Sequence, residues 1–445
     1  MPLKLPEDLL GKLGNAADAL SAASRVRVVS HYDGDGLCAA GILAKALHRK
    51  DLSFQVSTTR ALDQDFLDNL EGDEDVLLMA DMGSNRIQFL EKMDLQVIIL
   101  DHHQPEHDSD EVIHINSHLH GIDGTKGACA STLSFALATV MDDVNWDLTG
   151  IALAGAVADR QHPGGLEGLN LSIATEASER VGMRIERTHT FLGDDLAEAL
   201  SLSINPYIVG ISGDIDGARS FLSGLGISPD LPVDELKGEQ RTKLVSAVSL
   251  KLLEQGVTAE HVKGTIEEGY WDASRETYAN WIAAYVNSCG RLGMDGVGIA
   301  ICLGDPSALD EGKKLRNDFL NQVLGGLDRV RDEGAFEKNH IQFFYVDNPS
   351  FAGTIGGVAM RYILSPDFAT VALSVLTQKT RVSGRATKEL VSRGVNLADA
   401  FKESAEVLGG AGGGHSIAAG ASIPKGKEEK FLEYVDNTIE VQLEG

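Results

Sequence analysis

The chain has 445 residues, of which 43% are apolar and 24% are charged, so its composition is that of a globular protein with two or three domains. Its formal net charge of −27 excludes a surface that binds phosphates over its whole area, although it is compatible with a local basic groove or a cation-mediated phosphate site. No apolar run approaches the roughly 18 residues of a membrane helix, no signal peptide is expected, and four widely spaced cysteines exclude a zinc knuckle, so we expect a cytoplasmic protein without a membrane partner.

Four short apolar runs in the first third of the chain are typical of buried strands. They cover residues 26–30, 53–57, 75–80 and 96–100, and residues 37–48 have a helical pattern. Continuous apolar strands that alternate with helices predict a parallel sheet in an α/β fold. In such a sheet, ligands bind beyond the carboxyl ends of the strands.

The remaining sequence predicts more helices and a second, smaller α/β unit. Helices are expected at 129–140 and 148–158, in the polar stretch from about 190 to 285, at 305–333 and near 354–364, and strands at 341–347 and 370–376. We therefore expect an N-terminal domain over residues 1–304 with a helical insertion at about 190–285, a connecting helix over 305–335, and a C-terminal domain over 336–445.

Acidic residues and histidines follow the predicted strands and one helix. They are Asp33, Asp35, Asp81, His102 and Asp159. Each of them alone is explained by a turn or a helix cap. Together, four converging carboxylates would repel one another unless divalent cations lay among them. An oxygen-rich set with imidazole suits Mn²⁺ or Mg²⁺, and two such ions would serve a phosphoryl transfer.

A basic segment near the other end of the chain contrasts with the acidic composition. Residues 379–393 contain five basic residues and one acidic residue, a pattern that is usually a solvated charged face. The segment precedes a glycine-rich stretch, which we interpret as a loop that lets a phosphate approach the backbone closely: Gly412, Gly413, Gly414 and His415. Arg385 could bind a phosphate through bidentate hydrogen bonds, and Arg291 in the segment GRLG is a second candidate phosphate ligand.

Four motifs, in this order, resemble those of the DHH phosphoesterase superfamily: SHYDGDG, MADMGS, LDHHQP and GAVAD. The segments VSGRAT (382–387) and GGAGGGHSIAAGASI (409–423) resemble the DHH-associated C-terminal domain, whose glycine-histidine loop holds the substrate. NSCGRLG (287–293) resembles a motif of the RecJ-like nuclease branch, with archaeal RecJ-like proteins the most similar group. The resemblance implies a catalytic N-terminal domain and a substrate-binding C-terminal domain.

The resemblance also implies a role for each metal ligand. Asp33 and Asp81 would bind one Mn²⁺ or Mg²⁺ ion. The second ion would be bound by Asp35, Asp81, His102 and Asp159, so that Asp81 bridges the two ions. His31 is a further candidate ligand, and its tight spacing to the aspartate pair matches the nuclease branch rather than the pyrophosphatase branch.

Other residues receive catalytic or substrate-binding roles from the same resemblance. His103 would contact the scissile phosphate, Asp101 would orient an imidazole, and Arg291 would contact a phosphate. The C-terminal substrate contacts would be Arg385, Gly412, Gly413, Gly414 and His415.

Three hypotheses for the function follow from these motifs. The first is a hydrolase, a RecJ-like exonuclease that acts on single-stranded DNA or RNA by a two-metal mechanism. The second is a phosphodiesterase for small substrates, such as very short RNA or cyclic dinucleotides. The third is a replisome scaffold, and the resemblance to archaeal relatives makes the GINS complex a candidate partner.

Overall fold

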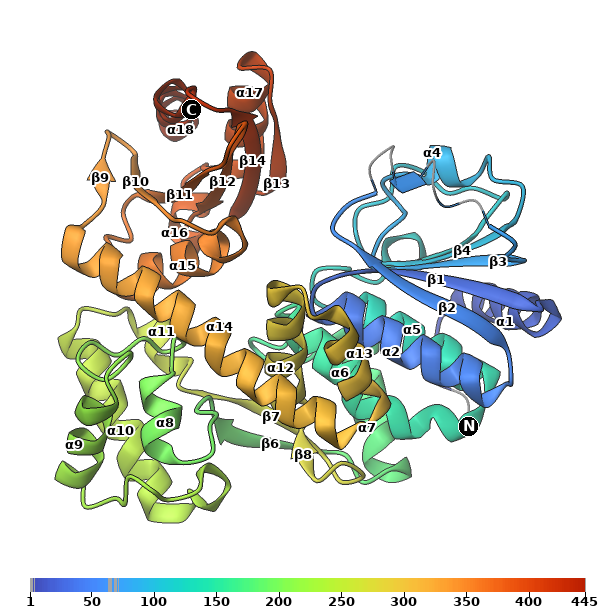
Figure 1. Cartoon of the computed structure of the whole chain (residues 1–445), viewed down its shortest axis with the longest axis horizontal. Coiled ribbons are helices and arrows are strands. Elements are labelled where there is room, and N and C mark those ends of the chain that lie inside the picture. Colours follow the sequence, from blue (N-terminus) through green and yellow to red (C-terminus); the bar gives the residue numbers. More distant parts are fainter. Residues whose placement is uncertain (1–2, 4, 63–65, 68–69, 71, 445) are drawn as a thin grey trace. The chain divides into compact units, whose positions relative to one another are not determined.

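The structure is a computed structural model that describes residues 3, 5–62, 66–67, 70 and 72–444. It contains two compact units, each formed by two stretches of the chain. The first comprises Met1–Thr188 and Glu267–Asn317, and the second comprises His189–Ile266 and Asp318–Gly445. Each unit is described separately below (Figure 1).

A five-stranded parallel sheet forms the centre of the first unit. Its strand order is β2-β1-β3-β4-β5, with β1 Arg25–His31, β2 Ser53–Thr59, β3 Val76–Ala80, β4 Gln96–Asp101 and β5 Ile113–Asn116. The predicted α/β class with a parallel sheet is therefore confirmed, as are four of the strands. The sequence did not indicate β5, because its four residues include the polar His114 and Asn116, both buried.

Helices surround this sheet. Their bounds are α1 Glu7–Ala22, α2 Gly34–Arg49, α4 Ile87–Leu90, α5 Ala130–Met141, α6 Thr149–Ala158, α7 Gly168–Arg180, α12 Ala279–Leu292 and α13 Asp295–Leu303, with 3₁₀ turns at Ser117–His120 and Asp143–Leu148. Small residues let α6 pack closely against α2, α5 and α12. A methyl group at Gly34 of α2, for example, would lie 2.5 Å from the Cβ atom of Ala158.

The predicted helical stretch at about 190–285 is correct in its middle and wrong toward its end. Helices occupy α8 Leu196–Ser201, α9 Ile215–Gly224, α10 Gly238–Glu254 and α11 Ala259–Lys263, with a 3₁₀ turn at Val233–Glu235. A small sheet follows, with strand order β6-β7-β8: β6 Arg184–His189, β7 Ile266–Asp272 and β8 Thr277–Tyr278. The sequence of β7, IEEGYWD, concealed the strand because Gly269 interrupts it; a side chain there would lie 2.6 Å from Cγ2 of Thr188.

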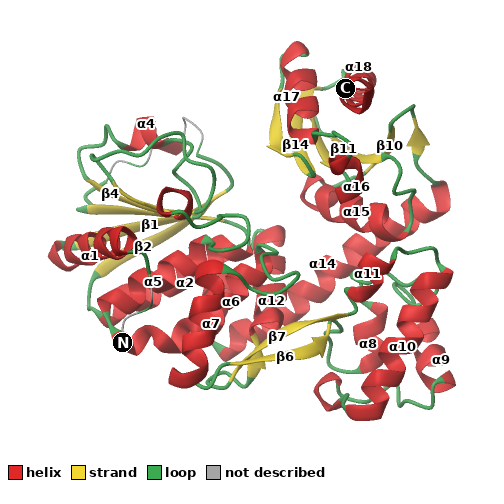
Figure 2. Ribbon diagram, turned by 180° about the vertical axis from the view of Figure 1, so that it is seen from behind, coloured by secondary structure: helices red, strands yellow, loops and turns green. Residues whose placement is uncertain are grey.

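The second unit holds a mixed six-stranded sheet of order β13-β14-β12-β11-β10-β9. Its strands are β9 Phe336–Glu337, β10 Ile341–Tyr345, β11 Ala369–Val375, β12 Lys379–Arg385, β13 Ala411–His415 and β14 Ala418–Pro424, and only β10 and β11 run parallel to each other. The amphipathic helix expected at 305–333 is α14 Pro306–Glu333, and the other helices are α15 Pro349–Tyr362, α16 Lys388–Ser392, α17 Leu397–Val407 and α18 Glu428–Glu444 (Figure 2). Side chains from α17 and α18 share one hydrophobic core with the sheet.

The glycine-rich segment interpreted as a loop is a strand instead. Gly412, Gly413 and Gly414 lie in β13, the edge of this sheet, and pair with β14. Glycine has a low preference for strands, which is why the sequence favoured a loop. The structure explains the composition, because a side chain at Gly412 would lie 2.8 Å from the carbonyl carbon of Phe401 in α17.

Candidate active site

The segment after β1 places its two aspartates in different environments. Helix α2 begins at Gly34, three residues before the predicted start, and Asp33 caps it by accepting a hydrogen bond from the Gly36 N–H at 3.2 Å. Asp35 lies in the first turn and is 2% exposed. It accepts hydrogen bonds from the backbone N–H groups of Ala130 and Ser131 at the start of α5 (2.8 and 3.0 Å). The aspartate pair is therefore a helix start rather than only a turn.

Asp81 lies directly after β3 and is 4% exposed. Its backbone has a left-handed conformation (φ +61°), which aspartate tolerates better than most residues. One carboxylate oxygen is 3.2 Å from Nε2 of His102, and the other is 3.4 Å from Nδ1 of His31. Asp81 therefore connects the residues that follow β1 with those that follow β4.

The triplet at the end of β4 is arranged around Asp101. Its Oδ1 accepts hydrogen bonds from the backbone N–H groups of His102 and His103 and from Nδ1 of His103, at 2.8, 3.1 and 2.8 Å. Burial alone would raise the pKa of Asp101, but these bonds and the nearby imidazoles hold it well below its usual range. Asp101 thus fixes the direction of the His103 ring, whose side chain is 48% exposed.

His102 points into the carboxylate cluster. Its Nδ1 lies 2.6 Å from the carbonyl oxygen of Gly124, and its Nε2 lies 3.8 Å from Asp159 and 3.9 Å from Asp35. Asp159 caps the C-terminal end of α6, where the sequence placed it.

The pKa values of the cluster show how crowded its charges are. Burial, reinforced by Asp35 and Asp81, raises the pKa of Asp159 to about 7, although His102 opposes the shift. Burial and Asp81 likewise raise the pKa of Asp35. For His31, burial acts in the opposite direction, but hydrogen bonds to Asp33 and Asp81 raise the pKa to about 11. Burial and mutual repulsion therefore favour positive charge, from protons or from cations, among these carboxylates.

Two groups of candidate ligands are present, and Asp81 belongs to both. Within each group, the ligand atoms lie within 4.8 Å of one another. The groups are His31, Asp33 and Asp81, and Asp81, His102 and His103. The six predicted ligands are thereby brought together, since Asp35 and Asp159 both approach His102. Carboxylates with imidazoles are a donor set that fits Mn²⁺ or Mg²⁺.

Arg291, near the end of α12, lies beside this cluster. Its guanidinium donates a hydrogen bond to the hydroxyl of Tyr32 at 3.1 Å. Burial would raise the pKa of Asp33, but the hydrogen bond from His31 lowers it, and the positive charge of Arg291 lowers it further. The guanidinium carbon of Arg60 lies 4.4 Å from the centroid of the same tyrosine ring. No motif or spacing in the sequence indicated a role for Arg60 or Tyr32.

The sequence also missed buried polar residues behind the cluster. Ser84 donates its backbone N–H to Asp101 at 3.0 Å, and Asn116 donates to the Ser84 hydroxyl and to the carbonyl of His103, both at 2.8 Å. Gln161 contacts Asp159 at 2.8 Å. Asn116 and Gln161 are isolated polar residues without a spacing pattern, so no sequence signal distinguishes them from other buried polar groups. Ser84 ends the motif MADMGS, but that motif did not indicate its contact with Asp101.

The candidate substrate contacts of the C-terminal domain lie in the second unit. Arg385 ends β12, and its Nη1 donates a hydrogen bond to the carbonyl of Gly384 at 2.7 Å. Gly413 has no heavy atom within 4 Å of a built Cβ position, whereas Gly414 has φ +141° and a side chain there would lie 2.5 Å from the Ala418 carbonyl oxygen. His415 is an exposed residue at the end of the strand.

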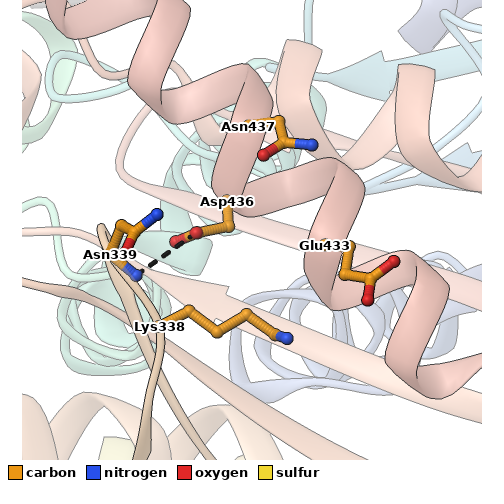
Figure 3. A pocket seen from close by; sticks show the side chains of 5 residues that line it. All are labelled: Lys338, Asn339, Glu433, Asp436 and Asn437. Atoms are coloured by element: carbon orange, nitrogen blue, oxygen red, sulfur yellow. Dashed lines mark hydrogen bonds between the residues drawn. The ribbon is translucent and has the colours of Figure 1, made fainter.

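A cavity of about 360 Å³ in the second unit is a separate feature (Figure 3). It is lined by Lys338, Asn339, Glu433, Asp436 and Asn437. The Asp436 carboxylate accepts hydrogen bonds from the backbone N–H groups of residues 339–341, at 2.7 to 3.2 Å. These bonds connect α18 to the start of β10. None of the predicted site residues lines this cavity.

Comparison with known proteins identifies both units of the fold. Residues 25–158 match the DHH family, N-terminal domain, and residues 341–441 match the DHHA1 domain. The chain belongs to the DHH/DHHA1 phosphoesterase family. This family consists of hydrolases, so the chain is a DHH-family phosphoesterase with a candidate metal site. Among the described residues, no helix is both long and apolar enough to cross a bilayer.

Several relatives of this DHH/DHHA1 protein match nearly its whole length. An uncharacterized protein of Methanocaldococcus jannaschii is 29% identical over 428 residues, which cover 94% of each chain. The fold resembles exonuclease RecJ bound to manganese (TM-score 0.60, 17% identity, 99% of this chain and 95% of that one). It also resembles CDC45 from Entamoeba histolytica (TM-score 0.66, 11% identity, 98% of both chains). RecJ from Thermus thermophilus with Mn²⁺ matches at a TM-score of 0.61 and 18% identity, over 99% of this chain and 56% of that one.

Proposed function

We propose that this chain is an exonuclease that hydrolyses single-stranded DNA or RNA and uses two Mn²⁺ or Mg²⁺ ions. The observation that carries the proposal is the convergence of carboxylates and imidazoles at one edge of the parallel sheet, with Asp81 common to both ligand groups. Cations bound among these buried carboxylates would relieve the repulsion between them.

The proposed ligands come from three strand ends and one helix end. One ion would be held by Asp33 and Asp81, with His31 beside them, and the other by Asp35, Asp81, His102 and Asp159. Such ions supply positive charge to the phosphate and activate water for its attack.

The chain's own residues would bind and orient the phosphate. The His103 ring, held through Nδ1 by Asp101, presents its other edge outward and would stabilise charge on the scissile phosphate. Arg291 would contact a neighbouring phosphate, because its guanidinium lies against Tyr32 next to Asp33. In the second unit, Arg385 and the glycine strand would hold the rest of the nucleic acid strand.

The second candidate, a scaffold within a replisome that includes a GINS-type partner, rests on the resemblance of the motifs to archaeal relatives, and the fold resembles that of CDC45. The complete carboxylate set argues against a scaffold that has lost catalysis, since a buried acidic cluster has a cost in stability that a pure scaffold need not bear. A phosphodiesterase for small substrates is the remaining alternative.

The test uses purified protein with end-labelled single strands of DNA and RNA and either Mn²⁺ or Mg²⁺, with product lengths resolved over time. We expect a ladder that shortens from one end, and no products with EDTA or with Asp81→Asn. Cleavage of dinucleotides alone would favour the small-substrate enzyme. No cleavage of any substrate, together with binding of a replisome component, would favour the scaffold.

A further inference from the structure

Gln161, three residues beyond α6, is a buried residue beside the candidate metal ligand Asp159. Its side chain is 2% exposed. Its Nε2 lies within hydrogen-bonding distance of three oxygens: Oδ2 of Asp159 at 2.8 Å and the carbonyls of Gly124 and Ala128 at 2.9 Å each. Its backbone N–H donates to the carbonyl of Ala156 at 2.9 Å, which fixes the residue to the last turn of the helix.

The orientation of the Gln161 amide is unambiguous. Its Oε1 accepts a hydrogen bond of 2.7 Å from Nδ2 of Asn170, a fully buried residue of α7. Three acceptors surround the amide nitrogen and one donor faces the amide oxygen, so the reversed orientation would leave several groups without partners. The amide is therefore a donor on the side of the metal centre.

The Gly124 carbonyl links Gln161 to His102. This oxygen receives Nε2 of Gln161 on one side and lies 2.6 Å from Nδ1 of His102 on the other. Because Nδ1 is committed to the Gly124 carbonyl, Nε2, which faces Asp81, is the ring nitrogen that a metal would use. Gly124 itself has no room for a side chain, because a Cβ atom would collide with the His102 carbonyl and lie 2.7 Å from Nε2 of His118.

We propose that Gln161 is a positioning residue of the metal centre. One amide group holds the Asp159 carboxylate directly and, through the Gly124 carbonyl, sets the ring direction and tautomer of His102. These two ligands lie at the ends of different elements, α6 and β4, and the Gln161 amide holds both of them in position. The inference rests on the proposed function in that it requires a divalent cation at this centre. Loss of such a supporting bond usually lowers metal affinity by about 10- to 100-fold.

The test compares Gln161→Met with Gln342→Met in the full chain. Methionine keeps the length of glutamine and removes its hydrogen bonds. Gln342 is a matched control, because it is 1% exposed and its Nε2 donates to the Ser365 carbonyl and the Thr370 hydroxyl, at 2.7 and 2.9 Å, in the second unit. Mn²⁺ binding is measured by titration calorimetry below the unfolding transitions, and stability is measured by thermal unfolding in EDTA.

We expect both variants to unfold at lower temperature and only Gln161→Met to lose Mn²⁺ affinity, by about 10- to 100-fold. Wild-type affinity in Gln161→Met, or an equal loss in Gln342→Met, would overturn the positioning role. If Gln161→Met does not fold, Gln161→Asn, whose shorter amide falls short of Asp159 and Gly124, is measured in the same way and with the same criteria. Absence of Mn²⁺ binding in the wild type would overturn the metal centre itself, so the two failures are distinguishable.

Discussion

The five-stranded and the six-stranded sheet of this protein present opposite kinds of edge. The carboxyl edge of the parallel sheet in the first unit carries buried carboxylates and imidazoles, and its chemistry resides in side chains. The edge strand β13 of the second unit consists of Ala411, three glycines and His415, and it exposes mainly backbone. The first edge suits cations, and the second allows close approach of an anion to N–H groups.

This difference shows how a chain with a net charge of −27 would handle a polyanion. An acidic centre attracts cations and repels a phosphate backbone, so affinity for a nucleic acid strand must come mainly from other residues. The basic residues of β12 and α16, near the glycine strand in sequence and sheet order, are the candidates for that task. Division of labour between the two edges is therefore the hypothesis that the following experiments test.

The largest effect is expected at Asp81. Asp81→Asn should lower hydrolysis by about 10³-fold or more, since it removes the carboxylate common to both ligand groups. Asparagine is chosen because it accepts the left-handed backbone (φ +61°), whereas alanine would add about 1–2 kcal/mol of strain. Initial rates on labelled single strands measure the loss. Asp51→Asn, at another aspartate with positive φ (+54°) but an exposed one, is the control and should keep its full rate.

The next largest effect is expected at His103. His103→Ala should lower turnover by about 10²-fold, comparable to the loss of an oxyanion donor, while Mn²⁺ affinity changes little. His107→Ala, which removes another exposed histidine paired with an acid, should change neither turnover nor Mn²⁺ affinity. Since His103 also lies within 4.8 Å of Asp81 and His102, calorimetry decides its role. A loss of Mn²⁺ affinity as large as the loss of turnover would make His103 a metal ligand instead.

The two edges also differ in how far the sequence predicted them. Asp33, Asp81 and His102 were predicted to lie together because the ends of parallel strands meet at one edge, a rule that needs only strand positions. Strand β5 was missed, since buried His114 and Asn116 gave it no apolar run.

The supporting polar residues and the glycine strand could not be predicted from the sequence, because both depend on tertiary contacts. Ser84, Asn116 and Gln161 make hydrogen bonds to residues far from them in the chain, which no spacing in the sequence reports. The glycine strand was interpreted as a loop because its composition reflects the close approach of α17, a tertiary contact. Side-chain chemistry at strand ends is thus more predictable than backbone chemistry at a sheet edge.

The glycine edge is tested by Arg385→Ala combined with Gly413→Val. The first change removes a guanidinium and the second blocks approach to β13 without a clash, since nothing lies within 4 Å of the added Cβ. Affinity for a single strand should fall by about 10- to 100-fold, and the slope of affinity against salt should decrease by about one unit per lost phosphate contact. Binding is measured by fluorescence anisotropy across a salt series, with the Mn²⁺ affinity expected to stay unchanged.

Gly414→Val is the informative comparison for that variant. Its φ of +141° and the nearby Ala418 carbonyl mean that a side chain there disturbs the β13–β14 pairing itself. It should lower thermal stability as well as affinity, whereas Gly413→Val should lower affinity alone. If the double variant binds with wild-type affinity and salt slope, the strand is held elsewhere, and the proposed division of labour is wrong.

The smallest effect is expected from metal addition and is confined to one edge. With Mn²⁺ at about ten times its dissociation constant, openings that release the metal become about tenfold rarer, so amide hydrogen exchange should slow by that factor. We expect this protection in peptides that contain Asp33, Asp81 and His102, and none in β13 and β14, because the candidate ligands all lie in the first unit. Mass spectrometry of exchange with and without Mn²⁺ measures it, and Asp81→Asn should show no protection in either region. Protection that also covers the glycine edge would mean that cation binding and strand binding are coupled, and the two edges would then have to be treated as one site.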